Sequence, residues 1–323
     1  MQKLRAAVIG VGYLGNFHAQ KYAHCPDVDL VAVVDSDAQR AQEIAAKYAT
    51  RAVASYGDIL DLVDLVSIVV PPANHFSIAR DCLAAGVHTL VEKPVTERVD
   101  QAEALIELAT AGGLVLQVGH LERFNPVILA LRKHIRQPHL IEARRFSAYK
   151  QRGTEVDVVL DLMIHDIDIV LSIAESPVRA IQSSGTSVVT QDIDIAHARI
   201  EFESGLVAEL AASRVSQDPT RSMKVHQDGH FIELDYLNHE LRSGRLEAGC
   251  EREAESHSTF EIETLSGRDV LMDEICSFVD AVRHGAAPQV SGEDGKRALA
   301  LAIDISHRIN RYRATRAIMR DLR

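Results

Sequence analysis

Residues 4–15 read LRAAVIGVGYLG, a short apolar run that leads straight into glycines spaced as Gly-x-Gly-x-x-Gly. A helical segment follows, and the next apolar run ends at Asp35, about 20 residues after the last of these glycines. Gly10 allows a tight turn, Gly12 lets the backbone approach a pyrophosphate, and Gly15 lets the helix pack on the strand. The free amides at the helix start bind the anion. The stretch therefore predicts a dinucleotide-binding βαβ unit.

The cofactor predicted for this unit is NAD. Asp35 is placed to accept hydrogen bonds from the adenosine ribose hydroxyls, and its charge repels the 2′-phosphate of NADP. Arg40, one helical turn further on, is a nearby cation that keeps NADP open as an alternative. Tyr13 and Leu14 lie within the glycine-rich loop, so we expect them to contact the cofactor together with the loop glycines.

The same alternation of strand and helix continues to about residue 120. Continuous apolar runs suit strands covered on both faces, and the segments between them carry the 3.6-residue periodicity of covering helices. With right-handed crossovers, such a series makes a doubly wound parallel sheet of about six strands, the Rossmann architecture of α/β proteins. The predicted strands are residues 4–9, 30–34, a weak one near 52, 65–70, 87–91 and 114–118, with helices at 38–49, 76–85 and 101–111.

A second domain is expected because the chain has 323 residues, about twice the length of an average domain. Consecutive strand candidates favour an open, mostly antiparallel sheet, and flanking helices make the domain α+β. The segments ESG (203–205) and QDG (227–229) are typical of hairpin turns, since glycine accepts positive φ. We place the NAD-binding domain at 1–122 and an α+β substrate-binding and oligomerisation domain at 123–323. Its predicted helices are 126–135, 158–174, 270–283 and 295–313, and its strands are 140–149, 178–189, 195–202, 207–212, 221–226, 230–237 and 240–246.

Composition excludes several classes of function. The chain has 35 Lys and Arg against 46 Asp and Glu, a formal charge of -11 that repels nucleic acid and anionic lipid. Its apolar runs fall far short of the ~20 residues that a membrane span needs. The 4 cysteines are scattered and the histidines lack ligand spacing, so we expect no disulfide framework and no metal site. A cytoplasmic protein with a small-molecule substrate, and without nucleic-acid or membrane partners, is predicted.

Candidate site residues follow two of the predicted strands. Pro71, Asn74 and His75 come after the fourth apolar run, and Glu92 and Lys93, followed by a proline, come after the fifth. Ligands of doubly wound sheets bind at the carboxyl ends of the strands, so we expect these residues to line the cofactor site. A lysine at a strand end is more often a solvated surface residue, and only its position favours a functional role.

These motifs together resemble the Gfo/Idh/MocA oxidoreductases, named for glucose-fructose oxidoreductase and inositol dehydrogenase. The residues that carry the resemblance are the glycine-rich loop with Asp35, PPANH at 71–75 and AGVHTLVEKP at 85–94. The resemblance implies a Rossmann domain, an α+β domain with an open sheet, a bound NAD(P), and hydride transfer at a CH–OH carbon of a sugar or polyol. It also implies that Lys93 is catalytic and that a later helix brings an Asp-x-x-x-His pair to the nicotinamide.

That pair is Asp161 and His165. At positions i and i+4 the two side chains lie on one face of a helix, where the carboxylate can fix the imidazole tautomer and raise its basicity. His165 would take the hydroxyl proton, and Lys93 would stabilise the developing alkoxide. The alternative is a purely structural role, in which Asp161 stabilises the first turn of the helix and His165 packs nearby. Asp166 and Asp168 are expected to be supporting or solvated groups.

A narrower resemblance concerns the substrate. The segment GHLERFNP (119–126) and residues 157–168 look more like family members that act on nucleotide-linked sugars, in particular those that oxidise C3 of UDP-N-acetylglucosamine. Many polyol dehydrogenases place glycines just before the Asp-x-x-x-His helix, and this chain does not. The predicted substrate-binding residues are Arg123, Asn125, Lys150, Arg152 and His165.

Two other functions stay open at this point. One is a dehydrogenase or reductase of a free sugar or polyol such as inositol, and the other is a non-catalytic, nucleotide-sensing regulator. A regulator has no need of Lys93, Asp161 and His165, which are all present. An exposed sheet face on the second domain would be a liability in a monomer, so we expect a homodimer or homotetramer.

Overall fold

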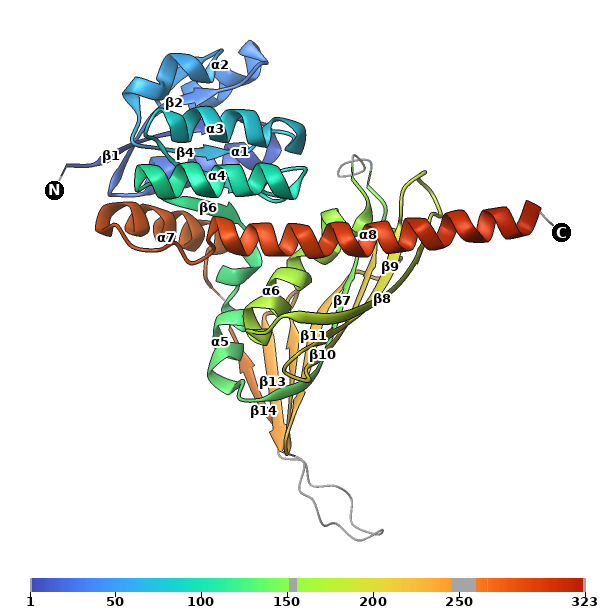
Figure 1. Cartoon of the computed structure of the whole chain (residues 1–323). Helices are drawn as coiled ribbons and strands as arrows, with labels where there is room; N and C mark the ends of the chain where they lie inside the picture. Colours follow the sequence, from blue (N-terminus) through green and yellow to red (C-terminus); the bar gives the residue numbers. More distant parts are fainter. Residues whose placement is uncertain (1, 151–155, 246–259, 266, 322–323) are drawn as a thin grey trace, which may run out of the picture. The chain divides into compact units, whose positions relative to one another are not determined.

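The structure is a computed structural model that describes residues 2–150, 156–245, 260–265 and 267–321. The chain forms two compact units, which are considered separately (Figure 1). Unit 1 comprises Met1–Phe124 and Asp269–Leu299, and unit 2 comprises Asn125–Arg268 and Ala300–Arg323. The long helix α8 (Gly292–Asp321) therefore supplies residues to both units.

Unit 1 contains a parallel sheet in the order β3-β2-β1-β4-β5-β6. This order is the doubly wound arrangement predicted from the sequence: β2 and β3 extend the sheet on one side of β1, and β4, β5 and β6 extend it on the other side. Its strands are β1 (Leu4–Ile9), β2 (Val28–Val34), β3 (Arg51–Val53), β4 (Leu65–Ile68), β5 (His88–Glu92) and β6 (Leu116–Gly119). Its helices are α1 (Tyr13–His24), α2 (Ala38–Lys47), α3 (His75–Ala84) and α4 (Val99–Gly112), with 3-10 turns at Tyr56–Leu62, Pro72–Asn74 and Leu121–Phe124.

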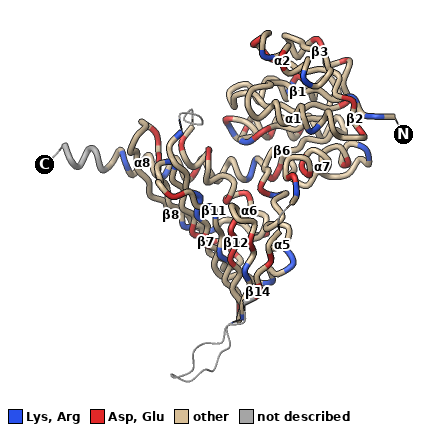
Figure 2. The backbone as a smooth tube through the Cα atoms, turned by 180° about the vertical axis from the view of Figure 1, so that it is seen from behind, with Lys and Arg blue, Asp and Glu red and all other residues tan. Residues whose placement is uncertain are grey.

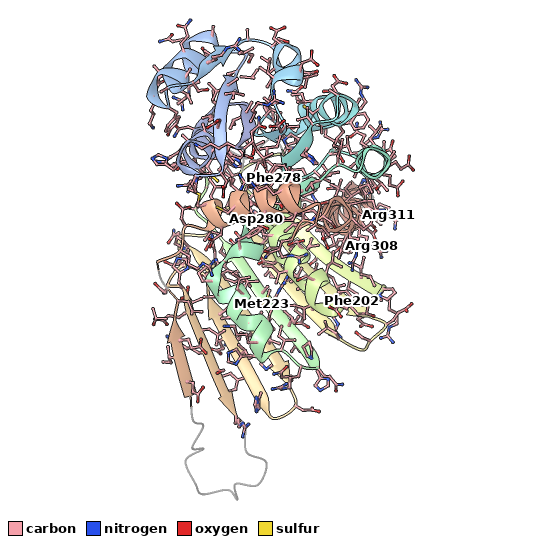
Figure 3. The ribbon with its side chains drawn as sticks, turned by 90° about the vertical axis from the view of Figure 1, so that its left-hand side faces the viewer. Phe202, Met223, Phe278, Asp280, Arg308 and Arg311 are labelled. Carbon is pink, nitrogen blue, oxygen red and sulfur yellow. The ribbon has the colours of Figure 1, made fainter. Side chains whose placement is uncertain are left out.

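A late segment of the chain completes unit 1. Helix α7 (Val270–His284) places Ile275 and Phe278 in the same core cluster as Val8 of β1 (Figure 3 labels Phe278). Beyond it, Ser291 forms a bridge with Gln117 of β6. The sequence predicted that all residues after 122 belong to one second domain. In the structure, residues 269–299 belong to unit 1 instead. The apolar stripe of a helix shows that one face must be buried but does not say which sheet will cover it.

Unit 2 contains a sheet in the order β14-β13-β12-β11-β7-β10-β9-β8. Of the described strand pairs in this sheet, only β7 and β10 are parallel, so the sheet is mostly antiparallel, as predicted. Gly205 and Gly229 have φ of 90° and 66°, as the predicted hairpin turns require. The strands are β7 (Pro138–Phe146), β8 (Val178–Thr186), β9 (Ile195–Phe202), β10 (Val207–Ser213), β11 (Thr220–Gln227), β12 (His230–Asp235), β13 (Glu240–Arg245) and β14 (Phe260–Thr264), of which the last was not predicted.

The two faces of this sheet differ in chemistry. One face is apolar: Phe202 of β9 and Met223 of β11 are fully buried there (Figure 3). The helices of unit 2 are α5 (Pro126–His134), α6 (Ile164–Ala174) and the later part of α8, which donates and accepts bonds along β8. The other face is charged, and Figure 2 shows basic and acidic residues interspersed along the strands. Ion pairs cross neighbouring strands on that face, from Arg199 to Glu209 at 3.0 Å and from Lys224 to Glu233 at 2.7 Å.

Candidate functional site

The glycine-rich loop between β1 and α1 has the shape that a pyrophosphate requires. Gly10 has φ of 86°, and a Cβ on it would lie 2.5 Å from the carbonyl oxygen of Val69. A Cβ on Gly15 would lie 1.8 Å from the carbonyl oxygen of Gly10, whereas a Cβ on Gly12 would meet no atom of another described segment within 4 Å. Packing thus requires the first and last glycines, and the middle one leaves open space beside the amides of the α1 start. The loop fits a dinucleotide.

Asp35 lies directly beside this loop. Its Oδ2 accepts a hydrogen bond from the Val11 amide at 2.8 Å, and its Oδ1 accepts one from the Asp37 amide at 3.0 Å. The carboxylate is therefore fixed in position, and each oxygen has a further lone pair for a ribose hydroxyl. Arg40 donates from Nε to the Val11 carbonyl oxygen at 2.9 Å and pairs with Glu43, so its guanidinium binds the loop itself.

The side chains of the first α1 turn face outward. Tyr13 is 65% exposed and Leu14 is 37% exposed, and the Tyr13 ring packs edge-on against Phe17. Two large apolar side chains exposed next to the glycine-rich loop are consistent with the predicted cofactor contact.

His75 ties together the ends of two strands. Its imidazole is 1% exposed and contacts the carbonyl oxygens of Val70 and Pro94, each at 2.8 Å. Burial lowers the pKa of His75, although the two carbonyl contacts oppose that shift. The sequence predicted a cofactor contact, and the structure assigns His75 a clear role in joining the loops after β4 and β5. Its predicted neighbours Pro71 and Asn74 are exposed.

Glu92 is the last residue of β5, and each of its carboxylate oxygens accepts a hydrogen bond. Its Oε1 accepts a hydrogen bond from His18 Nε2 at 3.2 Å, and its Oε2 accepts one from the Lys93 amide at 3.3 Å. Burial alone would raise the pKa of Glu92, but the bond to His18 and the neighbouring positive charges bring it below its ordinary value. Glu92 is thus an anion. Lys93 follows it, half-buried, at the carboxyl end of the strand.

Sequence reasoning missed His18, although a signal was available. On α1 the buried residues are Gly15, His18, Ala19 and Tyr22, so the histidine lies within the helical stripe that faces the sheet. A polar residue within such a stripe needs a buried partner.

In unit 2, Asp161 and His165 lie at the junction of two helical forms. A π-helical turn (Val159–Met163) contains Asp161, and α6 begins at Ile164, so that His165 is its second residue. The sequence predicted one regular helix over 158–174, and this is corrected because periodicity does not reveal a wider turn. Such turns are frequent at functional sites. Both side chains are half-buried.

The residue after His165 has a structural partner. Asp166 is buried and accepts two hydrogen bonds from Arg145 of β7, at 3.0 and 2.8 Å. Asp168 is also buried, at 1% exposure. Of the two roles predicted for these acids, supporting or solvated, their burial excludes the solvated one, and Asp166 supports the fold through Arg145. The sequence alone did not distinguish Arg145 from Arg144, because both are arginines on the same predicted strand. In the structure Arg145 is buried and Arg144 is exposed.

The predicted substrate residues differ in their surroundings. Arg123 is 4% exposed and lies 3.6 Å from Asp294 within unit 1. Asn125 caps α5, where its Oδ1 accepts the Val127 amide at 3.2 Å. Lys150 is exposed after β7, and Arg152 lies outside the described residues.

Comparison with known proteins identifies the family. The sequence model of the oxidoreductase family with an NAD-binding Rossmann fold, GFO_IDH_MocA, matches residues 4–120, and its C-terminal domain model matches residues 128–231. The chain belongs to the Gfo/Idh/MocA oxidoreductase family. It is therefore an enzyme, an NAD-dependent oxidoreductase that acts on a CH–OH group. The nucleotide-sensing regulator is set aside.

Individual relatives within the Gfo/Idh/MocA family refine this result. UDP-N-acetylglucosamine 3-dehydrogenase of Acidithiobacillus ferrooxidans is 38% identical over 306 residues, covering 94% of this chain and 97% of the relative. A solved structure of that enzyme has a TM-score of 0.89 and covers 96% of this chain and 98% of its own. The scyllo-inositol 2-dehydrogenase (NAD(+)) of Bacillus subtilis is more distant, at 25% identity over 93% of this chain and 92% of its own length.

Neither a metal site nor a membrane span is found in the described part of the chain. Residues 2–150, 156–245, 260–265 and 267–321 contain no group of three or more His, Cys, Asp or Glu side chains arranged to hold a metal ion. In the same part of the chain, every helix is too short or too polar to cross a bilayer.

Proposed function

We propose that this enzyme oxidises the C3 hydroxyl of UDP-N-acetylglucosamine to a ketone, with NAD as the acceptor. The observation that carries the proposal is the 38% identity to a UDP-N-acetylglucosamine 3-dehydrogenase along nearly the whole of both chains. The motifs at 119–126 and 157–168 support the same choice of substrate. NAD, when bound, takes the hydride from the reacting carbon.

The catalytic roles are assigned residue by residue. His165 accepts the proton of the substrate hydroxyl, which suits an imidazole because its ordinary pKa of ~6.5 leaves it mostly neutral in the cytoplasm. Asp161 orients that imidazole. Lys93, at the carboxyl end of β5, stabilises the negative charge that develops on the substrate oxygen.

The cofactor site is assigned to unit 1. The amides of the glycine-rich loop and the start of α1 bind the pyrophosphate, and Asp35 selects NAD by repelling a 2′-phosphate. The residues proposed to bind NAD are Gly10, Gly12, Tyr13, Leu14, Gly15, Asp35, Pro71, Asn74, His75, Glu92 and Lys93.

A net-acidic protein needs local cations to bind the diphosphate of a UDP-sugar. We assign this role first to Lys150, which is exposed, and to Arg152. Arg123 and Asn125 are also proposed substrate contacts, in addition to the structural contacts described above.

We also propose that the enzyme is cytoplasmic, where NAD and nucleotide sugars are found, and that it forms a homodimer or homotetramer. The charged face of the unit 2 sheet is the proposed interface. Alternating charges such as Arg199, Glu209, Lys224 and Glu233 can complement a second copy rotated by 180°. Sedimentation velocity tests this, and a monomer at micromolar concentration would contradict it.

The substrate is tested by following NADH absorbance with UDP-N-acetylglucosamine, N-acetylglucosamine, glucose and myo-inositol side by side. A keto acid acceptor is included so that tightly bound NADH can be reoxidised. We expect turnover of the UDP-sugar alone, because binding energy from the UDP moiety positions the reacting carbon. Isothermal titration with UDP gives an independent readout of that binding. Activity on a free sugar or inositol, with none on UDP-N-acetylglucosamine, would favour the polyol dehydrogenase alternative.

A further inference from the structure

A buried acid in unit 1 has no role in the function proposed above. Glu274 of α7 is 0% exposed, and neither of its carboxyl oxygens has a hydrogen-bond partner among the described residues. Burial, together with the charge of Glu92, raises the pKa of Glu274 well above its ordinary value. Leaving a buried carboxylate without a partner is costly, so the group carries a proton instead.

Other buried polar groups of unit 1 are also incompletely bonded. Gln117 of β6 donates from Nε2 to the backbone carbonyl of Glu274 at 3.3 Å, while its own Oε1 is buried without a partner in the described structure. His18 of α1 bonds Glu92 through Nε2, and its Nδ1 likewise has no described partner. These bonds join β6 to α7 and α1 to β5.

The Glu92 carboxylate packs directly against a glycine. Glu92 pairs with Gly119 across β5 and β6, and a Cβ on that glycine would lie 2.9 Å from Glu92 Oε1. The same side of β6 carries Gln117, two residues earlier, which bonds the Glu274 backbone. The charge of Glu92 acts on both Lys93 and Glu274.

We propose that Glu274 and His18 are positioning residues for the Glu92–Lys93 turn: Glu274 stays protonated and neutral, and His18 holds Glu92 as the anion beside Lys93. A fully buried carboxyl group without a donor is more stable as the neutral acid. The single negative charge of Glu92 matches the lysine, whereas a second charge on Glu274 would pull the ammonium group inward, away from a substrate. The proposal rests on the proposed catalytic role of Lys93.

The first test is the pH dependence of stability, which requires no substrate. A carboxyl whose pKa is raised by folding stabilises the fold below its ordinary value of 4.5, and this contribution is lost as the pH rises toward the raised value. The urea midpoint of the wild type should therefore fall from pH 5 to pH 8 relative to that of Glu274→Gln. Asp280→Asn, which removes an exposed charge from the same helix (Figure 3), is the matched control. Its urea midpoint should change with pH in the same way as that of the wild type. An equal change of the urea midpoint with pH in the wild type and Glu274→Gln would overturn the neutral state of Glu274.

The second test separates positioning from packing. Glu274→Gln and Glu274→Met both keep this side chain uncharged, so each should remove the part of the alkaline limb of the kcat–pH profile that comes from ionisation of Glu274, while NADH binding, followed by fluorescence, changes little. A merely structural role would leave that limb in place. His18→Asn removes the group that holds Glu92, and we expect it to lower kcat by about tenfold in the folded enzyme. Wild-type kcat in folded His18→Asn, together with a wild-type pH profile in the folded Glu274 variants, would overturn the positioning role.

Lys93→Met is measured in parallel. If it loses activity while His18→Asn keeps the wild-type kcat and the Glu274 variants keep the wild-type pH profile, the positioning proposal fails and the proposed function stands. If Lys93→Met keeps full activity, the proposed role of Lys93 fails, and with it the positioning role, whereas the stability test still decides whether Glu274 is neutral.

Discussion

Two buried acids, one in each unit, behave in opposite ways. Asp194 of unit 2 and Glu274 of unit 1 are both 0% exposed. The Asp194 carboxylate accepts hydrogen bonds from the amides of Val188, Val189 and Thr190 at 2.7, 2.7 and 2.9 Å. Burial alone would raise its pKa, but these donors lower it to about 2. Glu274, with no described donor, has its pKa raised. Donors, more than depth of burial, decide the charge of a buried acid.

A similar contrast holds for other buried groups. In unit 2, Asp194 and the Arg145–Asp166 pair have close partners and hold strands and turns together, although Arg214 of the same unit has two guanidinium nitrogens without a described partner. In unit 1, His18 binds Glu92 before Lys93, and both His18 and Glu274 have bonding capacity unused among the described residues. We therefore expect changes at the Glu92–Lys93 turn to alter rate, and changes at the buried charges of unit 2 to alter stability.

The largest expected effect is on rate. Lys93→Met should lower kcat by roughly 100- to 10,000-fold, because a group that stabilises developing charge contributes on that scale. NAD affinity and the urea midpoint should change little. His165→Asn is the unit 2 variant predicted to behave in the same way. Steady-state kinetics with UDP-N-acetylglucosamine measure both, and a near wild-type kcat in either variant would show that its role is assigned wrongly.

A large loss of stability is expected from breaking the buried ion pair of unit 2. Arg145→Met leaves Asp166 buried without its partner, which should lower the free energy of unfolding by about 3–5 kcal/mol. Arg144→Met, at the exposed neighbouring position, is the control and should cost less than about 0.5 kcal/mol. Urea denaturation measures both. Equal midpoints for the two variants would remove the contrast between the units.

A smaller and pH-dependent loss is expected at the buried acid of unit 2. The pKa of Asp194, about 2 against an ordinary 3.8, corresponds to a stabilisation of about 2 kcal/mol at pH 7. A lowered pKa gives stability that is present above the unfolded value and lost as the pH falls from about 4 to about 2. Asp194→Asn should therefore be less stable than the wild type at pH 7, with the gap closing toward pH 3. This trend is opposite to that expected at Glu274, and a gap that stays constant with pH would contradict it.

The smallest expected effect concerns cofactor choice in unit 1. Asp35→Ser removes the charge that repels a 2′-phosphate, so the ratio of NADP to NAD dissociation constants should fall by about tenfold, or about 1.4 kcal/mol. The midpoint of unfolding should be almost unchanged. Isothermal titration with both cofactors measures the ratio. Tighter binding of NADP than NAD by the wild-type enzyme would refute the selection by Asp35.

Local patterns were sufficient to predict much of the fold and part of the site. The glycine spacing at 10–15 predicted the loop because sterics act over a few residues: only glycine avoids the carbonyl oxygens of Val69 and Gly10. The order of apolar runs predicted the doubly wound sheet because right-handed crossovers leave few alternatives. The π turn that contains Asp161 could not be predicted, since periodicity over so short a segment fits a regular helix equally well.

The sequence by itself was enough to predict which side chains carry chemistry: Asp35 after its strand, Lys93 between a glutamate and a proline, and the Asp161 and His165 spacing. Only the tertiary structure decided which charges are paired and which lack a donor. Residues 269–299 join unit 1, where α7 brings Glu274 to within range of the Glu92 charge, far away in the sequence. The ionisation of a buried group depends on donors and charges that folding brings near, and no local pattern contains them.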